Sequence, residues 1–261
     1  MIQAIFLDVD GTLISFETHQ VPAASIEAIR RVRELGVKVI IASGRPASDL
    51  HEIDAVPYDA VVALNGSECV LRDGTYISRQ LIPAASFRRA LEISEQYGFV
   101  LALETNEGVF VNKMQPVVKE LARLVAHPVP EVVDIERMFM EKGCSQLCIY
   151  CDEPTERKVM AELPDLAASR WIDLFADVNV KGISKASGME EMARHFGFDL
   201  AETIAFGDGG NDIPMLRRAG IGVAMGNASD RVKAEADYVT DSVDDGGLPN
   251  ALRHFFGDNL K

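Results

Sequence analysis

The 261-residue sequence contains only four cysteines and has no excess of basic residues. Four cysteines in a chain of this length do not make the disulfide framework of a small secreted protein, so we expect a reducing, cytoplasmic location. The 26 Lys and Arg residues stand against 40 Asp and Glu residues, which gives a formal charge of −14. We therefore expect no nucleic-acid partner, because such proteins neutralise phosphates with a basic face. Binding to a membrane surface through basic segments is disfavoured for the same reason.

Long apolar runs, repeats and flexible linkers are also missing from the sequence. Apolar stretches such as 37–42 and 60–64 are far shorter than the roughly 18 residues that suggest a bilayer span. The opening residues, MIQAIFLDVDGTL, have no basic leader, so we expect them to form a first strand rather than a secretory signal. With 48% hydrophobic and 25% charged residues, the composition is that of a globular protein with a sizeable core.

Short apolar strands alternate with amphipathic helices in the first and last parts of the sequence. Strands are predicted at 4–7, 37–42, 60–64, 203–206, 221–224 and 238–240. Helices are predicted at 26–35, where apolar residues recur at helical spacing before Gly36, and at 213–218. This alternation predicts an α/β fold with a parallel sheet.

The pattern changes in the middle of the sequence. Around Asp73-Gly74, the flanking segments CVLR and TYIS predict a β-hairpin, because Asp-Gly suits a tight turn. Beyond it, predicted helices at 87–97, 117–125 and 156–163 mix with predicted strands at 99–103, 109–111, 146–151 and 171–175. We therefore predict a separate α+β domain at 83–178, inserted into an α/β core.

Acidic residues follow two of the predicted strands. Asp8 and Asp10 come after the first strand, where residues two apart project to the same side before Gly11 lets the backbone turn. Asp208 and Asp212 lie in the segment GDGGND, after a later strand. Because ligands of open α/β sheets bind at the carboxyl ends of the strands, we expect these carboxylates around one crevice.

Other polar groups are expected at the same edge of the sheet. Ser43, Gly44 and Arg45 follow the second strand, and Lys185 precedes an amphipathic segment at 189–196. An oxygen-rich acidic site without His or Cys suits Mg²⁺, and cations with glycine-bordered amides can hold a phosphate. The pattern predicts phosphoryl transfer, in which one carboxylate attacks phosphorus while a second protonates the leaving oxygen and later activates water.

The segments DVDGTL, SGR, Lys185 and GDGGNDIPML resemble, in that order, the four motifs of the haloacid dehalogenase superfamily. The insertion between Ser43 and Lys185 looks like the large type IIB cap of the Cof-type branch. The segments SFETH and RHFGF are similar to those of its bacterial sugar-phosphate (hexose phosphate) phosphatases. The resemblance implies a Rossmann-like parallel-sheet core at 1–82 and 179–261 and an α+β cap at 83–178 that selects the substrate.

The resemblance also implies the catalytic and metal-binding residues. Asp8 would be the nucleophile and Asp10 the general acid/base of a Mg²⁺-dependent phosphatase. The metal ion would be bound by the Asp8 carboxylate, the Asp10 backbone carbonyl and Asp208, with Asp212 in support.

Phosphate-binding and substrate-binding groups are implied in the same way. The transferred phosphoryl group would be held by Ser43, Gly44, Lys185 and Asn211. Arg45 and Asn65, the latter in the Asn-Gly turn after the third strand, would face the substrate or the cap. Ser43 stands where Thr is frequent, and Ala186 follows Lys185 where Gly is common, but neither departure removes a required group. Lys181 lies close enough in sequence to be an alternative to Lys185.

We expect hydrolysis of small phosphate monoesters, in particular sugar phosphates, and the partner would be a small phosphorylated metabolite. The protein is expected to be a monomer or a weak homo-oligomer. A phosphotransferase or phosphomutase would use the same aspartyl phosphate and pass the group to a second hydroxyl. A catalytically silent metabolite-binding protein is a further alternative, but it would be expected to lack Asp8, Asp10 or Asp208, and all three are there.

Two other segments contain residue types found in metal or nucleotide sites. Cys144, Cys148 and Cys151 with His127 suggest zinc, but their spacing is not the paired C-x-x-C pattern, so we expect small buried thiols. The glycines at 207–210 lack the G-x-x-x-x-G-K-[ST] pattern, which excludes a nucleoside triphosphatase of that kind.

Overall fold

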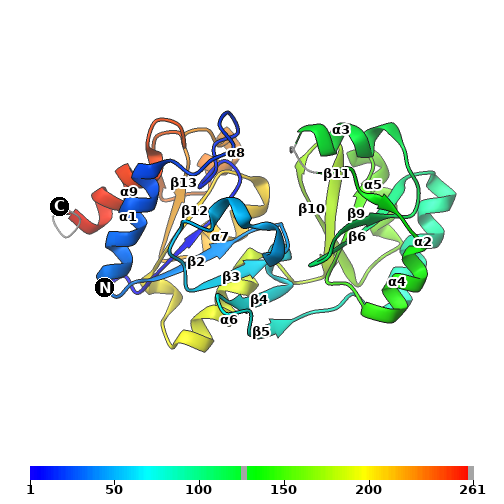
Figure 1. Ribbon diagram of the computed structural model, residues 1–261, viewed down its shortest axis with the longest axis horizontal. Helices are drawn as coiled ribbons and strands as arrows, with labels where there is room; N and C mark the ends of the chain where they lie inside the picture. The colour runs from blue at the N-terminus through cyan, green and yellow to red at the C-terminus, as the bar shows by residue number, and fades with distance from the viewer. Residues whose placement is uncertain (125–127, 258–261) are drawn as a thin grey trace. The chain divides into compact units, whose positions relative to one another are not determined.

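The computed structural model describes residues 1–124 and 128–257, which form two compact units. Unit 1 is built from two segments, Met1–Ser78 and Ser184–Lys261, and unit 2 is Arg79–Ile183. In Figure 1 the segments of unit 1 run from blue to cyan and from yellow to red, and unit 2 is largely green. Unit 2 thus begins and ends a few residues outside the range 83–178 that was predicted for the inserted domain. The reason is that Ile82 packs in the core of unit 2 and a strand of that unit continues to Val180.

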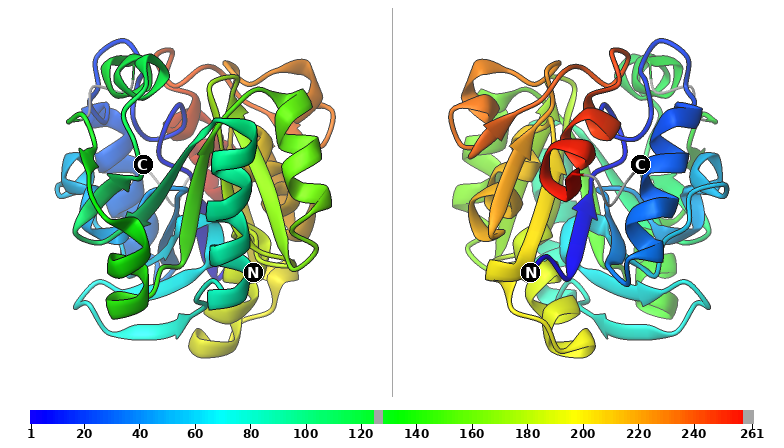
Figure 2. Two further views of the ribbon diagram at one scale, coloured as in Figure 1. Left: turned by 90° about the vertical axis from the view of Figure 1, so that its right-hand side faces the viewer. Right: turned by 90° about the vertical axis from the view of Figure 1, so that its left-hand side faces the viewer.

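Unit 1 contains one eight-stranded sheet with the order β14-β13-β12-β1-β2-β3-β4-β5. In chain order these strands are β1 (Ala4–Leu7), β2 (Lys38–Ala42), β3 (Ala60–Ala63), β4 (Glu68–Leu71), β5 (Tyr76–Arg79), β12 (Thr203–Gly207), β13 (Ile221–Ala224) and β14 (Tyr238–Val239). The strands from β14 to β3 run parallel, and β4 is antiparallel to β3. In the right-hand view of Figure 2, β1 (blue) lies beside β12 (yellow), so the two segments of unit 1 meet at the centre of the sheet. The predicted α/β class is confirmed.

Helices cover both faces of this sheet. On one face, α1 (Ala23–Glu34) and α9 (Gly247–Phe256) pack against apolar strand residues such as Ile5 and Ile41. On the other face, α6 (Lys185–Phe196), α7 (Ile213–Arg218) and α8 (Asp230–Lys233) pack against residues such as Phe6 and Ile40. Neighbouring residues of one strand therefore enter opposite cores, which explains why β1 and β2 are apolar nearly throughout.

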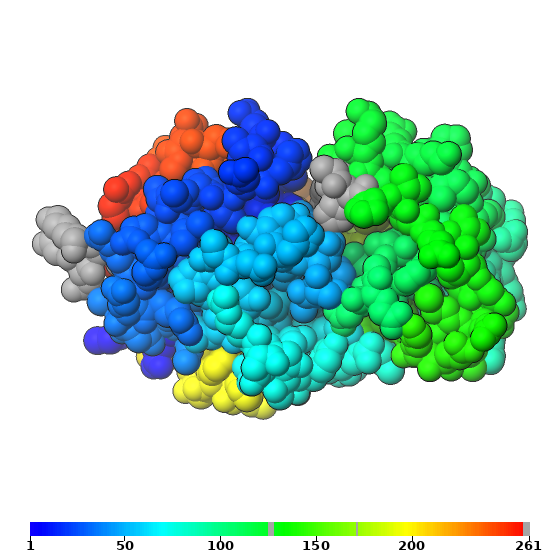
Figure 3. Space-filling view, in the orientation of Figure 1, coloured from blue at the N-terminus to red at the C-terminus, as the bar shows by residue number. Residues whose placement is uncertain are grey.

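Short 3₁₀ helices complete unit 1. They are η1 (Ala47–Asp49), η2 (His51–Ile53), η3 (Leu64–Gly66), η4 (Leu200–Glu202) and η5 (Gly210–Asp212). Three of them, η1, η3 and η5, lie shortly after β2, β3 and β12 respectively. In the space-filling view, the visible surface of unit 1 is formed mainly by the first segment, in blue and cyan (Figure 3).

Unit 2 contains a six-stranded, mostly antiparallel sheet with the order β10-β11-β9-β6-β7-β8. Its strands are β6 (Val100–Thr105), β7 (Gly108–Val111), β8 (Glu131–Val132), β9 (Gln146–Tyr150), β10 (Leu166–Ile172) and β11 (Phe175–Val180). One face packs against α2 (Ala84–Tyr97), α4 (Ile135–Lys142) and α5 (Glu153–Ala161), and the other against α3 (Pro116–Leu124).

The strand predicted at 171–175 is wrong. The structure has a turn at 173–174, which joins β10 to β11 in an antiparallel hairpin with Ile172 opposite Phe175. The sequence gives no Gly or Pro at this turn, and apolar residues continue on both sides of it, so the pattern resembled one uninterrupted strand. Within the described ranges, no helix is both long and apolar enough to cross a bilayer.

Candidate active site

The residues of the predicted site follow neighbouring parallel strands of unit 1. Asp8 comes directly after β1, Ser43 directly after β2 and Asp208 directly after β12, and Asn65 lies in η3 beyond β3. Because β12, β1, β2 and β3 are adjacent and parallel, their carboxyl ends lie at one edge of the sheet. The fold thus brings side chains from both segments of unit 1 to this edge.

Three carboxylates form an acidic centre here. One carboxylate oxygen each of Asp8, Asp208 and Asp212 lies within 4.8 Å of those of the other two. Burial raises the pKa of Asp8, and repulsion from Asp212 raises it further. Burial and the charge of Asp8 likewise raise the pKa of Asp208. Burial and neighbouring carboxylates thus disfavour the ionised forms of Asp8 and Asp208, and a bound cation would stabilise those forms.

Lys185 places a positive charge at the acidic centre. Its buried Nζ donates to Asp8 Oδ1 at 2.5 Å and to Asp212 Oδ1 at 2.6 Å. Burial acts to lower the pKa of Lys185, but Asp212 and Asp8 outweigh it and the pKa is raised. Lys185 is the first residue of α6 and follows the capping residue Ser184, so the start of the helix fixes its position. The alternative, Lys181, is an exposed residue of unit 2 whose backbone amide donates to the Asp165 carbonyl.

Asp212 is held by its own loop as well as by Lys185. Its Oδ2 accepts hydrogen bonds from the backbone amides of Asp208 at 3.0 Å and Gly209 at 2.8 Å. Both of its oxygens therefore have partners within the protein. Asp212 therefore holds the loop after β12 and the Lys185 ammonium in position.

Asp208 approaches the turn after β1 very closely. Gly11 has a φ of 84°, and a Cβ added there would lie 2.2 Å from Asp208 Oδ2. Only glycine fits this conformation and this distance. Asn227, which the sequence analysis did not identify, joins the two: its Nδ2 donates to the Gly11 carbonyl at 2.9 Å and to Asp208 Oδ2 at 3.1 Å. Its position shortly after β13, at the same end of the sheet, is the signal that could have identified it.

The carboxylate of Asp10 pairs with Arg45. Arg45 Nε donates to Asp10 Oδ2 at 2.9 Å, and Nη2 donates to Oδ1. A third bond, from Arg45 Nη1 to Glu52 Oε1, is 3.1 Å long. The structure therefore places Arg45, predicted to face the substrate or the cap, on the predicted general acid/base. Glu52 was not among the predicted site residues, because nothing in the sequence pattern links it to Asp10.

The turns after β2 and β3 are joined to each other. The backbone N–H of Asn65 donates to the backbone carbonyl of Ser43 at 3.0 Å. The buried Ser43 Oγ accepts from the backbone N–H of Arg45, two residues further on, at 3.1 Å. Asn65 Oδ1 accepts from Asn211 Nδ2 at 3.1 Å. Asn65 and the preceding leucine have φ values of 52° and 50°, which are uncommon outside glycine. Such strained backbone clusters at ligand sites, where the surrounding structure holds it in place.

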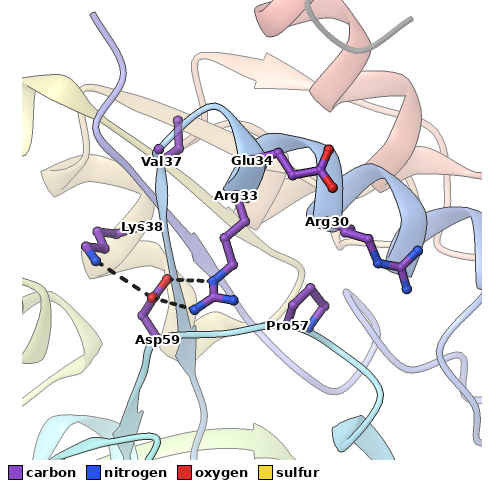
Figure 4. Close-up of a pocket in the computed structure, with 8 residues that line it drawn as sticks. Arg30, Arg33, Glu34, Val37, Lys38, Pro57 and Asp59 are labelled. Carbon is purple, nitrogen blue, oxygen red and sulfur yellow. Dashed lines mark hydrogen bonds and ion pairs between the residues drawn. The ribbon is translucent and has the colours of Figure 1, made fainter.

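A surface cavity of about 380 Å³ lies away from these residues. It is lined by Lys38 at the start of β2 and by Asp59 immediately before β3, so it belongs to the amino-terminal edge of the sheet. In Figure 4, Asp59 lies between Arg33 and Lys38 and pairs with both. The cavity contains none of the predicted site residues.

Unit 2 contains a second group of possible metal ligands. Cys148 Sγ donates to Glu104 Oε2 at 3.3 Å and to Asp177 Oδ1 at 3.6 Å, and Gln146 Nε2 donates to the same Glu104 oxygen at 2.6 Å. Burial, with the charge of Glu104, raises the pKa of the Cys148 thiol well above its usual range, so it stays protonated. Cys148 and Gln146 thus join Glu104 and Asp177 in one hydrogen-bonded network.

The expectation of small buried thiols holds for Cys144 and Cys148, whereas Cys151 is half-buried. None of the four cysteines forms a disulfide. His127, the fourth member of the zinc hypothesis, lies outside the described residues.

Comparison with known proteins identifies relatives over nearly the whole length. A model of the haloacid dehalogenase-like hydrolases matches residues 5–252. The structure of the phosphatase BT1666 from Bacteroides thetaiotaomicron is 58% identical with a TM-score of 0.95, covering 98% of this chain and 96% of that chain. The structure of the subclass IIB sugar phosphatase BT4131 is 36% identical with a TM-score of 0.89, and the match covers 97% of this chain and 99% of that chain. The 5-amino-6-(5-phospho-D-ribitylamino)uracil phosphatase YcsE of Bacillus subtilis is 27% identical, covering 97% of this chain and 96% of that protein.

Proposed function

The chain belongs to the haloacid dehalogenase-like hydrolase family, in its Cof-type branch with a subclass IIB cap, and we propose that this phosphatase hydrolyses small sugar phosphates with Mg²⁺. The observation that carries the proposal is the contact of Lys185 with Asp8 inside the acidic centre. A nucleophilic carboxylate, a fixed ammonium and further carboxylates at one point are the parts that phosphoryl transfer through an aspartyl phosphate needs.

The chemistry of the acidic centre fits Mg²⁺. Its donors are carboxylate oxygens without His or Cys, the ligand type that this ion prefers. Asp8, Asp208 and the Asp10 backbone carbonyl would hold the ion, with Asp212 in support. When bound, Mg²⁺ would supply positive charge that offsets the charge of the carboxylates and of the phosphate.

In the proposed reaction, Asp8 attacks phosphorus and the bond from phosphorus to the leaving oxygen breaks. Asp10 gives its proton to that oxygen and later takes a proton from the water that attacks the aspartyl phosphate at phosphorus. This attack breaks the bond from phosphorus to the Asp8 oxygen, releases inorganic phosphate and restores the Asp8 carboxylate. Lys185 holds Asp8 in position and balances the charge of the phosphoryl group. Further hydrogen bonds to the phosphoryl oxygens would come from Ser43, the Gly44 amide and Asn211.

We assign the choice of leaving group to unit 2. Two relatives support a polyhydroxylated leaving group, because one is a sugar phosphatase and the other acts on a phosphorylated ribityl compound. A cytoplasmic location belongs to the same proposal and is supported by the four cysteines, none of which forms a disulfide.

The proposal is tested by measuring phosphate release from a panel of phosphorylated sugars, sugar alcohols and nucleotides, with and without Mg²⁺. We expect release from sugar phosphates, and continued release in the presence of excess sugar acceptor. Transfer of the phosphoryl group to the acceptor would identify a phosphotransferase or mutase instead. Binding of these compounds with no turnover of any would support the silent binding protein and overturn the proposal.

A further inference from the structure

The guanidinium of Arg45 occupies both carboxylate oxygens of Asp10. Nε and Nη2 bond to different oxygens of the same carboxylate, in the paired geometry that suits Arg and carboxylate groups. The Arg45 side chain is 16% exposed and that of Asp10 is 29% exposed. A carboxylic acid that donates a proton has to turn one oxygen toward the leaving group, and the paired guanidinium fixes the orientation of both Asp10 oxygens. Asp10 therefore has to be released by Arg45 before it can do this.

Glu52 provides a second place for the same guanidinium. Its Oε1 already accepts from Arg45 Nη1, while its Oε2 is buried and accepts no hydrogen bond from any residue that the structure describes. His51 Nδ1 is 3.8 Å from that oxygen, which is beyond hydrogen-bond distance. A buried acceptor without a partner is costly and rare in folded proteins. Glu52 is thus ready to accept a further N–H from Arg45.

We propose that Glu52 is a positioning residue that draws Arg45 away from Asp10 and so frees Asp10 to act as the general acid. The backbone of Arg45 is fixed, because its amide donates to Ser43 Oγ and its carbonyl accepts from the Leu64 amide. Only the side chain has to rotate, and it exchanges its bonds to Asp10 for a bond to Glu52 Oε2. This inference rests on the proposed function, in which Asp10 protonates the leaving oxygen.

The test compares two substrates that differ in their need for an acid. A sugar phosphate has a poor leaving group that needs protonation, whereas para-nitrophenyl phosphate has a good one that does not. We expect Glu52→Gln to lower kcat/KM for a sugar phosphate about tenfold or more and to leave kcat/KM for para-nitrophenyl phosphate within about twofold. Glu190→Gln is the matched control, because Glu190 pairs with Arg218 at the surface, and it should change neither value.

A double-mutant cycle tests whether Glu52 acts through Arg45. In an Arg45→Met background, Glu52→Gln should cause no further loss with either substrate. Equal losses for the two substrates, or an undiminished loss in the Arg45→Met background, would overturn the inference. If Glu52→Gln does not fold, Glu52→Asp withdraws the carboxylate by one methylene and should give a smaller loss of the same selectivity. Failure of the unmodified protein to hydrolyse either substrate would instead count against the proposed function.

Discussion

Lys185 Nζ lies 2.5 Å from Asp8 Oδ1, although the two residues are 177 positions apart in the sequence. Both side chains are buried, and Asp212 is the second partner of the ammonium group. A buried charge is tolerated only when its partners are in place, so this contact couples the nucleophile to the start of α6 and to the loop after β12.

Asp8→Asn should abolish turnover, with a loss of about 10⁴-fold or more in kcat. The amide keeps the shape of the side chain but is not a nucleophile, and Lys185 keeps its bond to Asp212, so the fold should persist. Steady-state kinetics with circular dichroism checks this, with Asp73→Asn in the exposed hairpin turn as the control. Appreciable residual activity in a folded Asp8→Asn protein would show that another group attacks phosphorus.

Lys185→Ala should lower kcat/KM about a hundredfold or more, because it removes the charge that positions Asp8. Lys181→Ala should change kcat/KM by less than about twofold, because this residue is exposed in unit 2. The two variants are compared under identical Mg²⁺ and substrate concentrations. A larger effect at Lys181 would show that the wrong lysine has been assigned to the phosphoryl group.

Mg²⁺ should bind more tightly as the pH rises through neutrality. The pKa values of Asp8 and Asp208 are raised by burial and by neighbouring carboxylates, so the metal-free protein holds protons that the ion must displace. For the same reason, the metal-free protein should lose stability as the pH rises, and Mg²⁺ should restore it most at the higher pH. Calorimetric titration in two buffers of different ionisation enthalpy measures the proton release.

EDTA should stop the reaction and added Mg²⁺ should restore it. Activity that is indifferent to the chelator would remove the metal ion from the mechanism. A Mg²⁺ affinity that does not vary with pH would contradict the assignment of Asp8 and Asp208 as its ligands.

Asn227→Ala should weaken Mg²⁺ binding by about tenfold. The amide of Asn227 fixes Asp208 Oδ2 against the Gly11 carbonyl, and without it the carboxylate is free to rotate. Asn250→Ala is the control, because Asn250 makes a comparable bond to the carboxylate of Asp241. Equal Mg²⁺ affinities for the two variants would show that Asn227 does not position Asp208.

Asp59→Ala should destabilise the protein by about 1 to 2 kcal/mol at neutral pH. Asp59 pairs with Arg33 and Lys38 and accepts from the Val39 amide at 3.0 Å. Burial acts to raise the pKa of Asp59, but these partners outweigh it and hold the pKa below its usual value. The stabilisation is therefore present above the unfolded pKa of about 3.9 and is lost as the pH falls below it.

Urea unfolding at neutral and acidic pH checks the prediction for Asp59. Glu34→Ala is the matched control, because Glu34 lines the same cavity in Figure 4 but is exposed. A destabilisation by Asp59→Ala that does not shrink in acid would show that packing, rather than charge, is what Asp59 contributes.

Elements with a strong local pattern were predictable from the sequence. The predicted strands at 4–7 and 221–224 and the helix at 213–218 match β1, β13 and α7 residue for residue. The hairpin around Asp73-Gly74 is confirmed, because β4 and β5 flank this turn. In each case the signal is local, because an apolar pattern or a turn dipeptide within the element's own residues is enough to predict it.

The side-chain contacts of the candidate site were less predictable. The sequence placed Asp8, Asp10 and Arg45 after strands, but nothing local indicates that Arg45 pairs with Asp10 or that Asn227 bonds to Asp208. These contacts join residues that follow different strands, so they depend on which strands are neighbours in the sheet and on the side-chain conformations adopted there. The helix α4 was missed as well, because its eight residues carry only a short amphipathic pattern.

The central position of β12 has a consequence for synthesis on the ribosome. Asp208 is translated 200 residues after Asp8, which takes roughly 10 to 40 s at about 5 to 20 residues per second. Until β12 emerges, the edge of β1 that will pair with it has no neighbouring strand, and its AIFL sequence is wholly apolar. An unpaired apolar edge is a template for aggregation, so the nascent chain is most vulnerable to chaperone capture during this interval.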